Sequence, residues 1–161
     1  MDLQEFTTHI KVGCELIGLD IGTGTIGVAI SDTSHFIATP SRTIFRTSFK
    51  KDMEELSRLL ADRTPCGIVS GLPLQPNGAE GSQAEYTRKT AERIAEQLNL
   101  PLYFQDERFS SKIMESVMIK EADLSRKKRK KVLDSSAAAY ILQSFLDIFT
   151  NFKNSMELKN K

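Results

Sequence analysis

Two short apolar segments near the amino terminus constrain the fold more than any other part of the chain. Residues 16–21 and 26–31 alternate branched apolar side chains with glycine, alanine, serine or aspartate, and Gly22-Thr23-Gly24 lies between them. This pattern predicts a β-hairpin with one apolar face and one face of small side chains. Small side chains allow a helix or a ligand to approach a strand closely, and both interpretations of this face stay open.

The rest of the chain alternates between extended and helical patterns. A third strand, bent near Pro40, a helix that begins at Phe49 and a strand that ends at Gly71 lead into a loop rich in glycine and proline. The next helix is expected to begin at a capping box formed by Ser82 and Glu85. The predicted strands cover 16–21, 26–31, 36–45, 66–71 and 101–105. Predicted helices begin near residues 49, 82 and 110, and the final one covers 132–149.

This order of elements predicts an α/β fold. The sheet is expected to be mixed and five-stranded, with its first three strands in a meander and with helices on both faces. Such an order matches the ribonuclease H-like arrangement. The 161 residues are expected to form one domain, which covers 15–149, with a flexible lead-in over 1–14 and a disordered tail over 150–161.

Composition and cysteine usage indicate a cytoplasmic protein. No apolar run approaches the roughly 20 residues that a bilayer requires, and the first residues lack the basic start and apolar stretch of a signal peptide. No membrane association is therefore predicted. Cys14 and Cys66 are the only cysteines, and each lies beside or within an apolar strand. They are interpreted as buried free thiols, which predicts a reducing environment.

Three carboxylates lie where a negative charge is unfavourable unless a cation or another partner neutralises it. Asp20 and Glu107 each follow an apolar strand, and Asp134 lies on the apolar stripe of the last helix. Because an unpaired buried charge destabilises a fold, such groups are paired, protonated or bound to a metal. If the three converge, they form a site for Mg²⁺ or Mn²⁺, which prefer oxygen ligands. The set predicts metal-dependent phosphodiester chemistry.

The distance between Glu107 and Asp20 raises a geometric difficulty. Their strands are two positions apart in the predicted sheet, about 10 Å, so Glu107 reaches the site only if its loop turns inward. Asp106 is the alternative ligand, and helix capping or a pair with Arg108 is the structural alternative for either carboxylate. Asp106, Arg108 and Ser110 are candidate supporting residues of the site.

A dense run of basic residues precedes Asp134. It holds six of the 22 basic residues, and without it 16 basic residues face 21 acidic ones, so the positive charge is concentrated in one segment. Such a run is commonly a solvated face or a flexible loop. Its position three residues before Asp134 favours contact with nucleic-acid phosphates. The run consists of Arg126, Lys127, Lys128, Arg129, Lys130 and Lys131.

Four segments, in order along the chain, resemble the motifs of the YqgF family. They are 16–22 with 26–32, Gly71-Leu72-Pro73-Leu74 with Asn77-Gly78, Asp106-Glu107-Arg108-Phe109-Ser110-Ser111, and Asp134-Ser135-Ser136-Ala137-Ala138-Ala139 with Ile141-Leu142. The match runs from about residue 15 to 148, and the combination is specific although each motif alone is weak. YqgF proteins are ribonuclease H-like proteins described as precursor 16S ribosomal RNA nucleases and as Holliday junction resolvase-like proteins.

The resemblance implies a metal-dependent endonuclease with Asp20, Glu107 and Asp134 as its acidic set, and it favours Glu107 over Asp106. Two Mg²⁺ or Mn²⁺ ions about 3.5–4 Å apart would activate the water and neutralise the leaving oxygen, with Asp20 bridging them. The preferred substrate is structured RNA, in 5′-end maturation of precursor 16S rRNA during ribosome biogenesis; the alternative is branched DNA. Neither phosphate contacts nor metal chemistry decides between the two, and the sequence does not determine the oligomeric state.

Other interpretations remain beside this one. Gly24-Thr25 stands where the family usually has a basic pair, so a phosphate contact at that turn is missing or is supplied elsewhere, as by the basic run. Asp20-Ile21-Gly22-Thr23 also resembles the phosphate-binding turn of the actin and sugar kinase superfamily, whose members bind ATP between two such domains. A non-cleaving rRNA-processing or transcription factor would keep the same acidic site. His9 and His35 have no ligand-like spacing, and no metal role is predicted for them.

Overall fold

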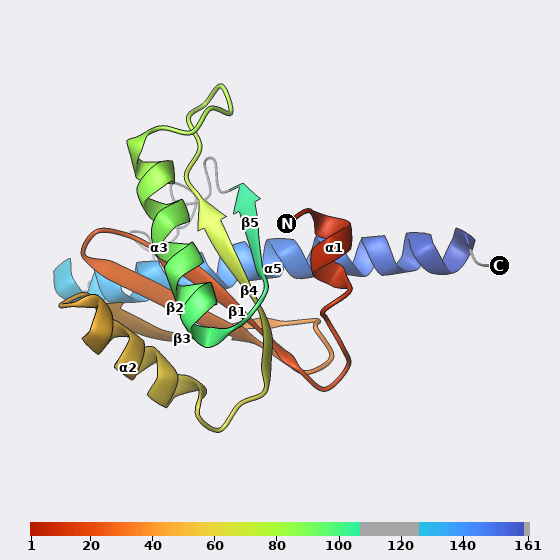
Figure 1. Cartoon of the computed structure of the whole chain (residues 1–161), viewed down its shortest axis with the longest axis horizontal. Coiled ribbons are helices and arrows are strands. Elements are labelled where there is room, and N and C mark those ends of the chain that lie inside the picture. Colours follow the sequence, from red (N-terminus) through yellow and green to blue (C-terminus); the bar gives the residue numbers. More distant parts are fainter. Residues whose placement is uncertain (107–125, 160–161) are drawn as a thin grey trace.

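The computed structural model describes residues 1–106 and 126–159, and within 126–135 it describes the backbone only. Its strands are β1 (Glu15–Ile21), β2 (Thr25–Ser31), β3 (Ala38–Phe45), β4 (Pro65–Leu72) and β5 (Leu102–Asp106). They form one sheet in the order β3-β2-β1-β4-β5 (Figure 1). β1, β2 and β3 are an antiparallel meander, β4 is parallel to β1, and β5 is parallel to β4.

Helices cover both faces of this sheet. α2 (Phe49–Leu60) and α3 (Ser82–Leu98) lie on one face, and α5 (Arg126–Lys159) crosses the other (Figure 1). The buried side chains of α2 and α3 pack on the branched apolar face of the hairpin, which includes Ile17 and Val28. The mixed sheet, its meander and its two helical layers confirm the predicted ribonuclease H-like α/β fold.

The small face of the hairpin is the face that α5 covers. A Cβ added to Gly18 would lie 2.8 Å from the carbonyl oxygen of Ala138 and 2.8 Å from Cβ of Leu142. Real Cβ atoms do not approach their neighbours so closely, so the helix can lie this near the strand only because residue 18 is glycine. Of the two interpretations that the sequence left open, close packing of a helix is confirmed at Gly18.

The contacts along α5 show that it runs antiparallel to β1. The middle of the helix lies over Gly18. Further along the helix, the Gln143 side chain accepts a hydrogen bond from the Ala38 amide at 2.9 Å, and the Phe149 ring meets the His35 ring at 5.9 Å. Both of these contacts lie at the end of the sheet where β1 begins. The amino-terminal part of α5 therefore lies toward the carboxyl end of β1.

The amino-terminal segment is folded, so the prediction of a flexible lead-in over 1–14 was wrong. Helix α1 (Leu3–Thr7) occupies part of it. Phe6 is fully buried, and its ring meets the rings of Tyr103 and Phe145 at centroid distances of 5.6 and 5.4 Å. Phe6, together with Leu3, holds this five-residue helix on the core, and so short a segment carries no readable periodicity.

Helix α5 also extends beyond both of its predicted ends. It was expected to cover 132–149 and to be followed by a disordered tail over 150–161, but it begins at Arg126 and ends at Lys159. The tail prediction was wrong because residues 150–159 contain no glycine or proline, and the Lys153 ammonium packs over the Phe149 ring at 4.6 Å. No described helix, α5 included, is apolar enough over a sufficient length to cross a membrane.

Cys14 and Cys66 form a disulfide, so their interpretation as free thiols was wrong. Their Cα atoms lie 5.7 Å apart although 52 positions separate them in the chain. The two cysteines are neighbours because β1 and β4 pair in parallel, with Glu15 opposite Pro65. This pairing is a tertiary event, and the composition of two isolated strands does not reveal it.

Helix α3 begins without the predicted capping box. Gly81 is the N-cap residue and has no side chain with which to cap the helix; its carbonyl accepts a hydrogen bond from the Glu85 amide at 3.0 Å. Ser82 is the first residue of the helix rather than its cap. The Glu85 carboxylate instead pairs with Lys89, one turn later, at 2.9 Å.

Candidate functional site

The candidate site lies at the carboxyl ends of β1 and β5, where α5 begins. Asp20 is the last residue but one of β1, is half-buried, and is in register with Gly27 of β2. Because side chains alternate along a strand, Asp20 shares a face with Gly18, which is the face that α5 covers. The strand thus presents this carboxylate on the side of the sheet from which the last helix approaches.

Asp134 lies in α5, one turn before Ala138. Ala138 is the residue whose carbonyl lies against Gly18. Four residues of helix rise about 6 Å, and two residues of strand rise about 6.6 Å. Because the helix and the strand are antiparallel, the backbone at position 134 is level with Asp20. The side chain of Asp134 lies outside the described residues.

Asp106 ends β5, where it is exposed and in register with Leu72 of β4. β4 lies between β1 and β5, so the strands of Asp20 and Asp106 are two positions apart, as predicted. Phe104 packs on the side of α2 and α3, and Tyr103 packs on the side of α5. By the same alternation, Asp106 belongs to the face of Phe104, which is the face opposite to Asp20.

The remaining predicted site residues are described in part or not at all. Glu107, Arg108 and Ser110 lie outside the described residues. The basic run 126–131 forms the first turns of α5, so its backbone is helical and not a loop, while its side chains lie outside the described residues. Six consecutive residues of an α-helix span more than one full turn, so the run is not confined to a single stripe.

Arg46, which the sequence did not single out, holds the hairpin turn that follows Asp20. Its guanidinium donates a hydrogen bond to the carbonyl of Gly22 at 3.1 Å, and its amide donates to the carbonyl of Gly24 at 3.0 Å. Asp52, which is only 4% exposed, pairs with the same guanidinium at 3.4 Å. One cation is therefore present beside the turn that lacks the family's basic pair. Only the pairing of β2 with β3 brings Arg46 there.

The loop between β4 and α3 is attached to α3 at its far end. Within the loop, the Gln75 amide donates a hydrogen bond to the carbonyl of Ala79 at 2.9 Å. Glu80 then pairs with Arg88 of α3, whose guanidinium lies over the Phe104 ring at 4.6 Å. The hydrogen bond from Arg88 lowers the pKa of Glu80. The loop that leaves the carboxyl end of β4 thus ends in a fixed ion pair.

Comparison with known proteins identifies the family. A family model described as "RuvX: Holliday junction resolvase" matches residues 14–148. A relative from Rhodobacter capsulatus is 48% identical over 145 residues, which are 90% of this chain and 91% of that protein. A relative from Cereibacter sphaeroides is 46% identical over 145 residues, 90% of each chain. Both relatives bear the name "Putative pre-16S rRNA nuclease".

A solved structure shares the fold. The fowlpox virus resolvase, in complex with its Holliday junction DNA substrate, matches with a TM-score of 0.52 at 14% identity, over 84% of this chain and 98% of that chain. At this identity the likeness concerns the fold alone. The family match contains all four segments that resemble the YqgF motifs, so that prediction is confirmed: the chain belongs to the RuvX family, that of the YqgF proteins.

Proposed function

We propose that this protein is a metal-dependent endonuclease that cleaves nucleic-acid phosphodiester bonds, with the 5′ end of precursor 16S rRNA as its substrate. The observation that carries the proposal is that Asp20 on β1 and position 134 on α5 lie at the same level of the sheet. These two carboxylate residues come from elements that meet only in the folded chain. The description of the family and the names of the two relatives support the same class of reaction.

The acidic set fits a hard divalent cation. Asp20, Glu107 and Asp134 would offer carboxylate oxygens to Mg²⁺ or Mn²⁺, which prefer such ligands. A pair of these ions activates a water and stabilises the leaving oxygen in phosphodiester hydrolysis. Asp20 would be the most rigidly held of the three ligands, because β1 is the central strand of the sheet. The register partner of Asp20 on β2 is Gly27, which has no side chain.

The alternation of β5 supports Glu107 over Asp106 as the second ligand. Asp106 belongs to the face of Phe104, which is covered by α2 and α3. That face is opposite to the one that carries Asp20, so Asp106 is poorly placed as a ligand and Glu107 is left as the candidate. Because β4 lies between β1 and β5, Glu107 would reach Asp20 only if its loop turned toward the site.

The basic run supports binding of a polyanion beside this site. The N-terminus of a helix already carries partial positive charge, and six cationic residues occupy the first turns of α5. The six positive charges repel one another and interact unfavourably with the helix dipole, and phosphates that bind among them relieve both effects. The run ends three residues before Asp134, so phosphates bound there would lie next to the proposed cations.

Structured RNA is preferred over branched DNA as the substrate. The relatives that are 46% and 48% identical over 90% of the chain are named for precursor 16S rRNA. The Holliday junction is named by the family description and by a structure that is 14% identical. Resolution of DNA junctions is therefore the second candidate function.

Cleavage of two labelled substrates tests the proposal: a precursor 16S 5′-leader RNA and a four-way DNA junction, each with Mg²⁺ or Mn²⁺. Wild type is run beside Asp20→Asn and beside Asp62→Asn, a matched change at an exposed aspartate between α2 and β4. We expect wild type and Asp62→Asn to cleave the RNA only when the metal is present. Asp20→Asn should bind the RNA without cleaving it.

The other outcomes separate the alternatives. Cleavage of the DNA junction alone would assign the resolvase function. If wild type binds the RNA and cleaves neither substrate, the nuclease proposal is wrong and a non-cleaving rRNA-processing factor takes its place. Equal activity in Asp20→Asn and wild type would show that the acidic set does not perform the reaction.

A further inference from the structure

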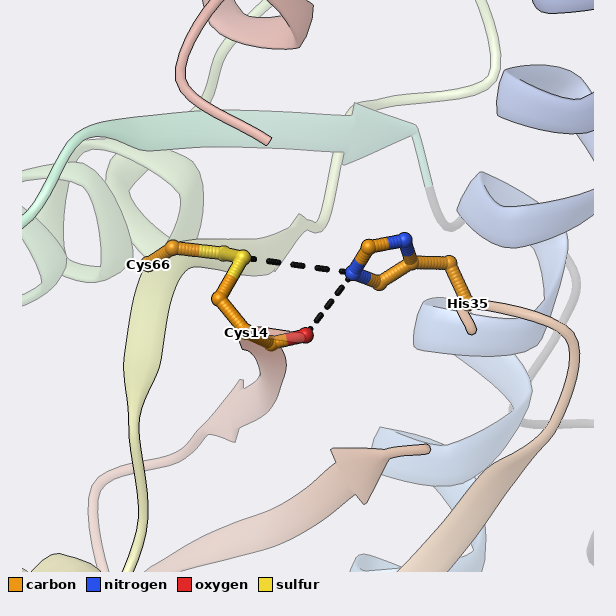
Figure 2. Close-up of side chains that lie close together, drawn as sticks. All are labelled: Cys14, His35 and Cys66. Carbon is orange, nitrogen blue, oxygen red and sulfur yellow. Dashed lines mark hydrogen bonds between the residues drawn. A yellow bond between two sulfur atoms is a disulfide. The ribbon is translucent and has the colours of Figure 1, made fainter. Parts of the chain in front are cut away.

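Three side chains with nitrogen and sulfur donors meet at the end of the sheet where β1 and β4 begin. Cys14, His35 and Cys66 offer ligand atoms that all lie within 4.8 Å of one another (Figure 2). His35 Nε2 is 4.0 Å from Cys14 Sγ, and the two sulfur atoms are joined in the disulfide. Cysteine sulfur and histidine nitrogen are the donors that zinc and similar divalent ions prefer.

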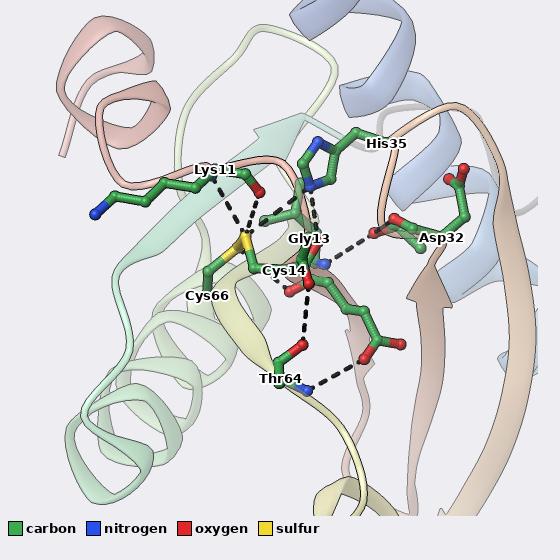
Figure 3. The surroundings of a disulfide bond; sticks show 10 residues. Lys11, Gly13, Cys14, Asp32, His35, Thr64 and Cys66 are labelled. Atoms are coloured by element: carbon green, nitrogen blue, oxygen red, sulfur yellow. Dashed lines mark hydrogen bonds between the residues drawn. A yellow bond between two sulfur atoms is a disulfide. The ribbon is translucent and has the colours of Figure 1, made fainter.

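The imidazole is held toward the sulfur atoms by its own turn. His35 lies between β2 and β3 with φ at +64°, a backbone conformation that few residues adopt. Its amide donates a hydrogen bond to the Asp32 carbonyl at 3.2 Å. The Asp32 carboxylate accepts hydrogen bonds from the amides of Phe36 at 2.8 Å and Ile37 at 2.9 Å. These bonds fix the loop around His35. Figure 3 shows the imidazole of His35 turned toward Cys14 and Cys66.

Burial also restricts the imidazole. His35 is 2% exposed, and its ring meets the ring of Phe149 of α5 edge-on. Nε2 donates a hydrogen bond to the Cys14 carbonyl at 2.8 Å, since a carbonyl can only accept. The nitrogen atom nearest to the sulfur atoms is therefore held in place from the backbone side and from the helix side. The ring is thus already placed beside the sulfur atoms, although Nε2 must give up its hydrogen bond to the Cys14 carbonyl before it can bind a metal.

We propose that, when the Cys14–Cys66 disulfide is reduced, both thiolates and His35 Nε2 bind one Zn²⁺ or a similar divalent transition metal. The disulfide and the metal are then alternative links between the same two cysteines. Two equivalents of a thiol, or a phosphine together with water, supply two electrons and two protons, which break the S–S bond and leave two thiols; the thiol becomes a disulfide and the phosphine a phosphine oxide. Zn²⁺ displaces the two thiol protons, and the neutral imidazole moves its proton from Nε2 to Nδ1.

The distances suit this exchange. With Zn–S near 2.3 Å and Zn–N near 2.0 Å, a tetrahedral site has ligand atoms about 3.5–3.8 Å apart. The Cys14 Sγ to His35 Nε2 distance of 4.0 Å is already close to that value, and the sulfur atoms need only separate by side-chain rotation after reduction. The Lys11 amide points at Cys14 Sγ at 3.4 Å and would donate a hydrogen bond to the thiolate. Three protein ligands leave a fourth position for water.

This site is separate from the candidate active site. Asp20 lies six residues along the chain from Cys14, about 20 Å in an extended strand, at the opposite end of the sheet. The donors also differ, since the acidic set offers only oxygen. A metal here would tie the amino-terminal segment, β4 and the turn before β3 together, and the inference does not depend on nuclease activity.

Zinc binding by the full-length protein tests the proposal. The protein is washed with a chelator, reduced with a phosphine in excess Mg²⁺, and titrated with Zn²⁺ against a chromophoric zinc indicator. We expect one tightly bound equivalent in the reduced protein and none at this site in the oxidised protein. Bound Zn²⁺ should also slow alkylation of both cysteines and raise the Tm of the reduced protein, because a ligand stabilises the state that it binds.

Matched variants identify the ligands. His35→Asn removes the imidazole but tolerates the positive φ, and it should weaken binding by more than about tenfold. His9→Asn changes the only other histidine, which is exposed, and Asp20→Asn changes the acidic set. Both variants should still bind one equivalent of Zn²⁺. Circular dichroism verifies that each variant is folded.

Two results would overturn the inference. The first is that reduced wild type takes up no more Zn²⁺ than the double variant Cys14→Ser/Cys66→Ser, and that the wild-type thiols are alkylated equally fast with and without the metal. The second is His35→Asn that binds as tightly as wild type, which would exclude the three-ligand site. The alkylation measurement uses wild type alone, so it decides the question even if a variant fails to fold.

Discussion

Gly18 of β1 lies directly against Leu142 of α5: a Cβ added to the glycine would be 2.8 Å from Cβ of the leucine. This contact sets the height of the last helix over the sheet. It also sets which turn of the helix is level with Asp20, since Asp134 lies two turns before Leu142. The packing of one glycine therefore determines which position of α5 lies level with Asp20.

Replacement of this glycine should disturb both stability and activity. Gly18→Ala forces α5 away from β1, and we expect it to lower the free energy of unfolding by about 1–3 kcal/mol, the usual cost of overpacking. The cleavage rate should fall as well, because the helix carries Asp134. Chemical denaturation and the RNA cleavage assay measure the two effects.

The control is Gly24→Ala, because nothing lies within 4 Å of the Cβ that it would add. Its effect on the free energy of unfolding should stay within about 0.5 kcal/mol. Equal stability of the two variants would contradict the close approach of α5 at Gly18.

The choice between Glu107 and Asp106 can be decided by a pair of isosteric variants. If Glu107 holds the metal, Glu107→Gln should lower the cleavage rate by more than about 100-fold, while RNA binding is kept. Asp106→Asn should change the rate little, because strand alternation assigns Asp106 to the opposite face. Cleavage rates measured over a range of Mn²⁺ concentrations separate a lost ligand from a weakened one. The reverse order of effects would assign the role to Asp106.

Arg46 is expected to matter for the stability of the turn beside Asp20. Arg46→Met removes the hydrogen bond to Gly22 and leaves the 4%-exposed Asp52 carboxylate without its cation. We expect a loss of about 1–3 kcal/mol in the free energy of unfolding. Arg42→Met is the matched control, because Arg42 is 57% exposed and pairs with Glu55 at the surface, where such a pair contributes less than about 1 kcal/mol. Similar losses in the two variants would exclude a special role for Arg46.

The turn that carries His35 should make stability depend on pH. Burial alone would raise the pKa of Asp32, but hydrogen bonds from the backbone amides, first that of Ile37 and then that of Phe36, lower it below its ordinary value of 3.8. The stabilisation by this ionised carboxylate is therefore fully present above pH 3.8 and is lost as the pH falls through the lower pKa of the folded state.

Asp32→Asn tests this sign. The amide oxygen of asparagine can accept the same hydrogen bonds, but it carries no charge at any pH. The difference in Tm between wild type and variant should be largest near neutral pH and should shrink as the solution becomes more acidic than pH 3.8. A difference that grows on acidification would show that Asp32 is not the group responsible.

Much of the fold could be predicted from the sequence because it depends on local patterns. Alternation along 16–21 and 26–31 identified the hairpin, and the apolar stripe from Phe49 identified α2. The prediction was wrong for the short helix α1, because the tertiary contacts of Phe6 outweigh the local pattern of the segment. The expected capping box at Ser82 failed for a similar reason, since the helix begins from the Gly81 carbonyl.

The sequence alone determined the family, the class of fold and the positions along the chain at which carboxylates follow strands. The family follows from the resemblance of four motif segments, whereas the class of fold and the carboxylate positions follow from side-chain chemistry and from periodicities of two and 3.6 residues, which each segment carries by itself. Only the tertiary structure decided which segments meet. The parallel pairing of β1 with β4 joins Cys14 to Cys66, and the turn between β2 and β3 brings His35 to both. The closeness of α5 to Gly18 sets the level of Asp134 against Asp20, because contacts between distant residues depend on how whole elements pack.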